Sequence, residues 1–350
     1  MDRKQVTIQD VAREAGVSTA TVSRTLSKPT VVAKPTRQAV LRAVQKTGYQ
    51  VNHLARNLRR GRTGSVIALA PNLANPFFSQ ILAGMSEVLS ARNYGLLIAD
   101  TQMGPDPDER LRRYLSAGAA DGLVLFDGSL SPAALDVPGR PPVVAACEWL
   151  KVDLPSIRVD NAMGAELAVA HLAGLGHSRI GHVTGPRRNV LARTRLAGWR
   201  DAMTRRGLDP REGWVFEGDF SMDSGAMAAR RWLAAPDRPT ALFFASDEMA
   251  VGFLGEARRA DVRAPRDVSV VGFDNIEVAA HLDPPLTTIR QPRTLIGQRA
   301  AALLMDLIEG GDGAAFESMV EVDLILRDST APPPPPAPAG QAPSKAAGAA

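Results

Sequence analysis

Cysteine is almost missing from this sequence. Cys147 is the only one in 350 residues, which excludes a disulfide framework and a multi-cysteine zinc site. Long apolar runs are lacking too, because the stretches at 65–70 and 121–126 are far too short to span a bilayer. The first 16 residues show no apolar segment followed by small residues, so we expect no secretory signal. These features together predict a cytoplasmic protein without a membrane partner.

Charge is distributed unevenly along the chain. The composition, 45% hydrophobic and 22% charged, is that of an ordinary globular protein, and the length suggests two or three folding units. Residues 1–62 carry 13 Lys/Arg and 3 Asp/Glu, a net +10, whereas the remainder has a net charge of −6. A basic end on an acidic body is expected of a protein that holds a polyanion at one end. A solvated basic arm without a partner would show the same charges, so the residue pattern must decide.

The basic end has the pattern of a helix-turn-helix. Thr7 and Asp10 form a capping-box-like start to a helix at 8–15, and Gly16 is placed to end it. Ser18 is the predicted cap of a second helix at 19–26, with Val22 and Leu26 facing inward. A third helix is predicted at 34–47, with its buried side formed by Val40, Leu41 and Val44.

The second of these helices has an exposed face suited to DNA. We expect Thr19, Ala20 and Arg24 to read bases, because small side chains permit close approach and arginine offers two donors to a guanine edge. Thr21 and Ser23 are expected on phosphates. Thr7, Ser18 and Lys28 complete the DNA contacts expected of this region. A generic three-helix bundle is the alternative, since helix-turn-helix spacing alone is a weak signal.

Two segments resemble the lactose/galactose repressor family of bacterial regulators. They are TIQDVAREAGVSTATVSRTLS and KTGYQVNHLARNL. The resemblance implies a hinge over 52–60 that becomes helical on operator DNA, where Leu58 wedges between central base pairs in the minor groove. Ala55, Arg56, Asn57 and Arg59 sit beside that leucine. An ordinary linker leucine is the alternative for Leu58. A palindromic operator requires two headpieces, so a homodimer is expected.

Beyond a linker at 61–64, short apolar runs alternate with helical patterns. Strands are predicted at 65–70, 96–99, 122–126, 143–146, 180–183, 215–217, 241–245, 268–272 and 319–326. Helices are predicted at 78–92, 162–175, 194–206, 223–234, 247–260 and 294–309. This alternation is typical of α/β folds with parallel sheets, and the strands exceed what one sheet would use.

The order of these elements is similar to the family's effector domain, which shares its fold with periplasmic sugar-binding proteins. The resemblance implies a two-lobed core of two doubly wound parallel sheets, with three crossings between the lobes, behind the all-α headpiece. The implied domains are the headpiece at 1–50, hinge and linker at 51–63, lobe one at 64–160 plus 292–326, lobe two at 161–291, and a disordered Pro/Ala-rich tail at 327–350.

Polar and aromatic residues follow several predicted strands. In such sheets ligands lie beyond the carboxyl ends of strands, here between the lobes. The candidates at these positions are Asn75, Phe77, Phe78, Glu148, Trp149, Arg193, Arg195, Phe220, Ser246 and Asp274. The resemblance assigns stacking on the effector to Phe78 and Phe220, and polar contacts to Arg195 and Asp274. Ser246 stands where some relatives use asparagine. The alternatives are a core role for Phe77 and a capping role for Asp274, and for Asp247 we favour the helix N-cap.

The stretches CEW, RVDN, GDF, GFDNI and DPPLTTIRQPRTLIG are most similar to members of the family that respond to nucleosides such as cytidine. We therefore expect a nucleoside effector, with a mono- or disaccharide as the alternative. Two other classes of protein fit the sequence less well. An enzyme is disfavoured because the chain has no phosphate-binding loop, no nucleophile elbow and no HExxH motif. The pair His177 and His182 lacks a carboxylate or cysteine cluster, so neither a metal nor a cofactor is expected. A free transport-binding protein would need a signal peptide and no headpiece.

Overall fold

The computed structural model describes residues 6–49, 62–103, 106–116, 118–312 and 317–334. It divides the chain into two compact units, residues 1–63 and 64–350. Each unit has its own hydrophobic core.

Within residues 6–49, the N-terminal unit contains three α-helices, which are α1 (Ile8–Ala15), α2 (Thr19–Ser27) and α3 (Lys34–Thr47). All three lie where the sequence predicts them, within one residue. Val11, Val22 and Val40 are fully buried and form the centre of a small core. Leu41 departs from the prediction, because 46% of it is exposed. The neighbouring positions Val40 and Ala43 take the inward side of α3, and Leu41 is one residue, or about 100°, further round the helix.

The C-terminal unit contains two six-stranded sheets, and the first defines lobe one. Its strand order is β11-β5-β4-β3-β1-β2, and every pairing is parallel. The strands are β1 (Ser65–Ala70), β2 (Gly95–Asp100), β3 (Gly122–Leu125), β4 (Val143–Ala146), β5 (Ser156–Val159) and β11 (Glu317–Val320).

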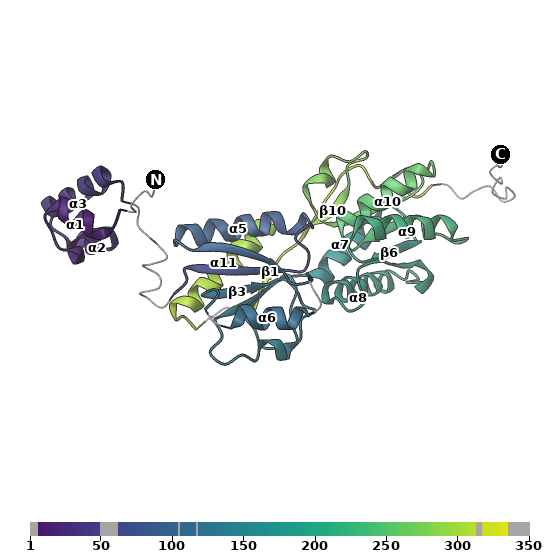
Figure 1. Ribbon diagram of the computed structural model, residues 1–350. Helices are drawn as coiled ribbons and strands as arrows, with labels where there is room; N and C mark the ends of the chain where they lie inside the picture. Colours follow the sequence, from purple (N-terminus) through teal and green to yellow (C-terminus); the bar gives the residue numbers. More distant parts are fainter. Residues whose placement is uncertain (1–5, 50–61, 104–105, 117, 313–316, 335–350) are drawn as a thin grey trace, which may run out of the picture. The chain divides into compact units, whose positions relative to one another are not determined.

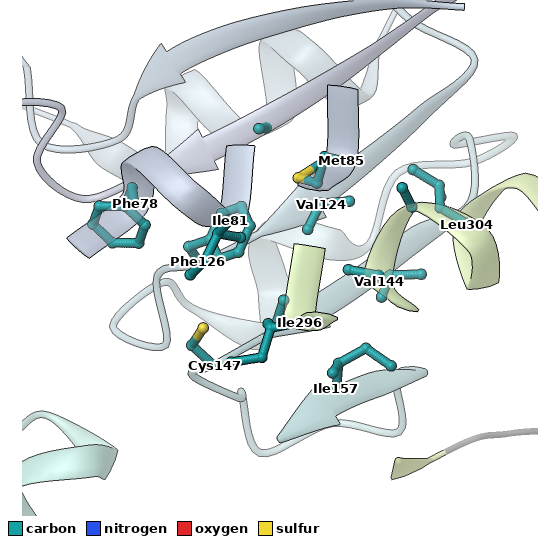
Figure 2. Close-up of a cluster of buried hydrophobic side chains, with 14 of the residues drawn as sticks. Phe78, Ile81, Met85, Val124, Phe126, Val144, Cys147, Ile157, Ile296 and Leu304 are labelled. Carbon is teal, nitrogen blue, oxygen red and sulfur yellow. The ribbon is translucent and has the colours of Figure 1, made fainter. Parts of the chain in front are cut away.

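Each face of this sheet is covered by helices, because its strands are apolar on both sides. Alternate residues such as Val66 and Val124 pack against α5 (Phe77–Ala91) and α11 (Arg293–Glu309). Figure 2 shows this layer, where Phe78, Ile81 and Met85 of α5 lie near the strand side chains. The intervening strand residues pack against α6 (Pro107–Leu115) on the other face (Figure 1).

The second sheet defines lobe two. Its order is β12-β10-β9-β8-β6-β7, with β10 and β12 antiparallel and the other pairs parallel. The strands are β6 (Ile180–Thr184), β7 (Val215–Glu217), β8 (Ala241–Phe244), β9 (Ser269–Asp274), β10 (Thr287–Arg290) and β12 (Asp323–Ile325). One face packs on α7 (Asn161–Gly174) and α8 (Val190–Arg205), and the other on α9 (Met222–Ala234) and α10 (Asp247–Arg259).

The chain passes between the lobes three times, after β5, after β10 and after β11, as the resemblance implied. One predicted boundary was wrong. The strand expected at 319–326 is two strands, and β12 belongs to lobe two rather than lobe one. Glu321 and Val322 connect them, and this is the third crossing.

The predicted start of the tail at residue 327 was also wrong. Ser329 is fully buried, its hydroxyl donates to the Val270 carbonyl at 2.6 Å, and it accepts from the Thr287 N–H at 2.8 Å. Two residues further, the Ala331 N–H donates to the Ser269 hydroxyl. The segment 327–331 is therefore part of lobe two, and residues 335–350 lie outside the described residues.

Candidate functional site

The turn between α1 and α2 is built by the residues that the sequence singles out. The Thr7 N–H and hydroxyl both donate to the Asp10 carboxylate, at 2.9 and 2.7 Å. Gly16 ends α1 with φ at 66°, a left-handed conformation that glycine adopts without strain. The Ser18 hydroxyl accepts from the Thr21 N–H at 3.1 Å and starts α2. This geometry confirms the predicted caps of both helices.

α2 presents a small, hydroxyl-rich and basic face. Thr19, Ala20, Ser23 and Arg24 are exposed, as is Lys28 at the end of the helix. Thr21 differs, because it is half-buried and its hydroxyl lies 2.9 Å from that of Ser18. It therefore helps to hold the turn. The predicted hinge residues Ala55, Arg56, Asn57, Leu58 and Arg59 lie outside the described residues.

In the core, Arg195 lies almost fully buried on α8, with 2% of its surface exposed. Its Nε donates to the Asn161 side chain at 2.8 Å, and its Nη1 donates to the Ala245 carbonyl at 2.5 Å. The guanidinium stacks over the Phe273 ring, 3.7 Å from the centroid. A buried charge needs such partners, and these come from the ends of strands and the starts of helices. Arg195 is thereby fixed where β8 and β9 of lobe two end.

Asp274 is the second charged group of this cluster. It ends β9 with φ at 116°, and its Oδ1 lies 3.9 Å from Arg195 Nη1. The Gln291 amide donates to the same oxygen at 2.6 Å. Burial raises the pKa of Asp274 to about 6, although Arg195 and Gln291 oppose the rise. The carboxylate therefore stays charged at neutral pH and can accept hydrogen bonds from a ligand.

Ser246 takes the capping role that was predicted for Asp247. The Ser246 hydroxyl accepts from the Met249 N–H and caps α10, so the N-cap expected at Asp247 was wrong by one residue. The fully buried Asp247 carboxylate instead accepts from the Ile276 N–H and the Thr288 hydroxyl. Burial, with Asp274 nearby, raises the pKa of Asp247. Asp247 thus fixes the backbone that follows Asp274.

Glu148 connects the lobes from the end of β4. Its carboxylate accepts from the Gly128 N–H and from the Asn189 amide, both at 2.7 Å. Gly128 belongs to lobe one and Asn189 caps α8 of lobe two. Burial raises the pKa of Glu148 to about 7. Burial also raises the pKa of the Cys147 thiol, with smaller contributions from Glu148 and Asp274. The Glu148–Asn189 hydrogen bond brings the end of β4 in lobe one to the start of α8 in lobe two.

The aromatic candidates divide into core and edge residues. Phe77 and Phe78 are 8% and 7% exposed and pack edge-to-face, so a core role for Phe77 is confirmed. Asn75 begins the helix by accepting from the Phe77 N–H at 2.8 Å. Phe220 is half-buried with φ at 71°, and its ring covers Gly185, where an added Cβ would collide with it.

Two candidates are less buried than Arg195 and Asp274. Arg193 is exposed, because two residues along a helix turn a side chain by about 200° from Arg195. Trp149 is half-buried and lies under the Arg158 guanidinium, 4.8 Å from its ring centroid. His177 and His182, the pair that could have suggested a metal site, are both buried in the core. His182 stacks on Phe243, and burial lowers its pKa to about 3.

Sequence reasoning missed three polar partners, Asn161, Asn189 and Gln291. Asn161 and Gln291 follow β5 and β10, the two short strands that the periodicity did not reveal. The signal was present in the stretches RVDN and TTIRQP, in which a polar residue follows alternating apolar ones. Asn189 lies at a helix start, where its capping role is readable from sequence.

A helix-turn-helix unit and a two-lobed α/β core with a buried polar cluster at the strand ends define a ligand-regulated DNA-binding protein. Comparisons with known proteins agree with this class. Residues 7–52 match the profile described as bacterial regulatory proteins, lacI family, and residues 169–330 match a periplasmic binding protein-like domain. Within the part of the chain that the structure describes, no helix has the length and apolar character needed to cross a membrane.

Three relatives illustrate the similarity. The HTH-type transcriptional repressor CytR of Escherichia coli K12 is 36% identical over 93% of this chain and 96% of its own length. The Lac repressor dimer bound to operator and the anti-inducer ONPF has 30% identity and a TM-score of 0.81 over 94% of this chain and 100% of that one. A CelR–cellobiose complex has 35% identity and a TM-score of 0.71, covering 93% and 100%.

The chain belongs to the lacI family of bacterial regulatory proteins. CytR and the Lac repressor are transcriptional repressors, and CelR is a transcriptional regulator, which confirms the expectations of a DNA-binding regulator and of a protein that is not an enzyme. The predicted fold is confirmed as well. The individual site residues stay predictions.

Proposed function

We propose that this chain represses a catabolic or uptake operon, and that a nucleoside such as cytidine, bound between the lobes, sets its affinity for a palindromic operator. The observation that carries the proposal is the buried cluster of Arg195, Asp274 and Glu148, where strand ends of both lobes meet. Carboxylates there can accept hydrogen bonds from ribose hydroxyls and from a base amine. The similarity to CytR favours a nucleoside.

A mono- or disaccharide is the second candidate, because the similar CelR structure holds cellobiose. The same carboxylates would accept from its hydroxyls, and Phe220 would cover one face of a sugar ring. In either case the effector changes the arrangement of the lobes, and coupling between two such sites is typically about 1–3 kcal/mol.

At the DNA end, we assign base reading to Thr19, Ala20 and Arg24 and phosphate contacts to Ser23 and Lys28. Their exposure on one helix supports this assignment. We retain Leu58 as the residue that wedges into the centre of the operator. A protein with this task works in the cytoplasm, where the operator is.

A dimer is part of this proposal, as in the Lac repressor structure. β2 is an edge strand of lobe one, and its neighbouring residues Leu97 and Ile98 are 49% and 46% exposed. Successive strand residues point to opposite faces, so both faces of this edge are apolar and accessible. Exposed apolar edges invite uncontrolled pairing unless they are covered. A second copy of the chain at this edge would cover it.

The identity of the effector is tested by a thermal-shift screen of nucleosides, nucleobases, and mono- and disaccharides. A ligand that binds the folded state raises the melting temperature of the protein. Compounds that raise it are then added to the protein on operator DNA. A nucleoside that both stabilises the protein and changes operator affinity supports the proposal. If only sugars stabilise the protein and change its operator affinity, the same repression mechanism controls an operon for carbohydrate uptake. If no compound of any class stabilises the protein, the effector site is wrongly assigned.

A further inference from the structure

A buried arginine stands at the start of α11, outside the cluster described above. Arg293 is 2% exposed, although it carries a full charge. Its Nη1 donates to the Pro76 and Phe77 carbonyls at 3.3 and 3.4 Å, and its Nη2 donates to the Asn275 carbonyl at 3.0 Å and the Glu277 carboxylate at 3.1 Å. A buried guanidinium with four acceptors is held in one place.

These acceptors belong to different lobes. Pro76 and Phe77 begin α5 of lobe one, whereas Asn275 and Glu277 follow β9 of lobe two. Gln80 of α5 adds a second link, because its amide donates to the same Glu277 oxygen at 2.5 Å. We call Arg293, Glu277 and Gln80 the interlobe clasp.

The clasp is joined to the effector cluster through both chain segments that meet there. Asp274 immediately precedes Asn275, and both have positive φ, at 116° and 54°. Gln291, which donates to Asp274, lies two residues before Arg293, and the Arg293 N–H donates to the Gln291 carbonyl at 2.8 Å. Positive φ is costly for residues other than glycine, so this backbone keeps its shape only while its contacts persist.

We propose that Arg293 is a positioning residue that transmits the occupancy of Asp274 to the arrangement of the two lobes. The inference rests on the proposed function in one respect, the placement of the effector at Asp274. A ligand that takes hydrogen bonds at Asp274 competes with Gln291 for the same carboxylate. Gln291 lies on the second crossing between lobes, so its displacement moves Arg293 relative to Asn275 and Glu277. The charge of Arg293 makes intermediate positions costly, since it would be left without acceptors in a buried place.

The test compares Arg293→Met with Arg290→Met in the full-length protein. Arg290 is a matched control, because it lies three residues earlier and its ion pair with Asp323, at 2.9 Å, joins β10 to β12 inside lobe two. Both substitutions replace an arginine by an unbranched apolar side chain. Glu277→Gln serves as a milder third variant, since 53% of the Glu277 side chain is exposed and its loss is not expected to prevent folding.

The first measurement needs no effector. Spin labels on Arg112→Cys in α6 and Asp201→Cys in α8, both exposed positions, report the distance between lobes. Labelled protein is diluted with unlabelled protein so that a dimer carries one labelled chain. We expect the distance distribution to broaden or shift in Arg293→Met and, less strongly, in Glu277→Gln, and to match the parent in Arg290→Met. A distribution unchanged in both clasp variants would overturn the proposal.

The second measurement is operator affinity with and without cytidine. In the parent the two affinities should differ by about 5- to 150-fold, the usual range of such coupling. In Arg293→Met the ratio should fall below about 2-fold while cytidine still raises the melting temperature. Full coupling in Arg293→Met would overturn the proposal. If cytidine has no effect even on the parent, the proposed effector is wrong, and the distance measurement still decides whether the clasp holds the lobes.

Discussion

Replacing Asp274 by asparagine should stabilise the protein while removing its effector response. Burial raises the pKa of Asp274 to about 6, compared with about 3.9 for an aspartate in an unfolded chain. A folded-state pKa above the unfolded value means that folding favours the protonated form. The resulting stability is complete below about pH 4 and is lost as the pH rises to about 6. At neutral pH the ionised Asp274 therefore costs the fold about 2–3 kcal/mol.

Asparagine keeps the shape of the side chain and removes this cost. Its carbonyl oxygen can accept the Gln291 amide at the same position, and asparagine tolerates positive φ better than most residues do. The variant does not titrate, so its advantage over the parent should grow with pH. Between pH 5 and pH 7.5 the gap should widen by about 1 kcal/mol, roughly the equivalent of one pKa unit. The loss of the charged acceptor should abolish the effector response.

The assay is chemical unfolding at several pH values, followed by tryptophan fluorescence. Trp199, Trp214 and Trp232 lie in lobe two with Asp274 and Trp149 lies in lobe one, so three of the four tryptophans report the relevant lobe. Effector response is measured on the same samples through operator affinity. A stability gap that stays constant from pH 5 to pH 7.5 would refute the reasoning about Asp274, and an unchanged effector response would refute its role in binding.

Three further predictions concern packing and DNA. Gly252→Ala should destabilise lobe two by about 1–3 kcal/mol, because the added Cβ collides with the Met222 carbonyl of α9. In the same helix, the Cβ of Gly255→Ala meets nothing within 4 Å, so this variant should be more stable than the parent by about 0.5–1 kcal/mol. The free energy of unfolding of both variants tests the prediction. Arg24→Ala should cost about 1–3 kcal/mol of discrimination at one base pair, measured with operator variants, and a uniform loss across all sequences would mean that Arg24 contacts only phosphate. Leu58→Ala should weaken binding to the operator far more than binding to random DNA in a mobility-shift assay, and equal losses would contradict the wedge.

Periodicity and caps were enough to locate most of the fold. The three headpiece helices, with the Thr7 and Ser18 caps, are local structures whose signals lie within a few residues. β5 and β10 were missed because each mixes polar with apolar residues, in SIRV and TTIR, whereas the equally short β3 and β4, GLVL and VVAA, are apolar throughout. The strand at 319–326 was merged because Glu321 and Val322 interrupt it without a glycine or proline to mark the break.

The sequence predicted which strand ends carry the candidate site, but not the contacts between its side chains. Arg195 and Asp274 were expected together, and they lie 3.9 Å apart. The Glu148–Asn189 hydrogen bond joins residues that lie in different lobes and 41 positions apart in the chain, and no local sequence pattern predicts it. Likewise, the choice between Ser246 and Asp247 as helix cap depends on Thr288 and Ile276, which become neighbours only after β9 and β10 pair with the rest of the sheet.

Because the chain returns to lobe two through β12, neither lobe is encoded by one continuous stretch of gene. A nonsense mutation just before codon 323 would therefore remove the edge strand and the buried Ser329 from lobe two, and not just a surface extension. Recombination cannot exchange one lobe for a homologue's by a single crossover. The headpiece, which ends before residue 64, can be exchanged in that way. Simple gene fusion can thus join one operator specificity to another effector specificity, whereas a new combination of the two lobes needs more than one crossover.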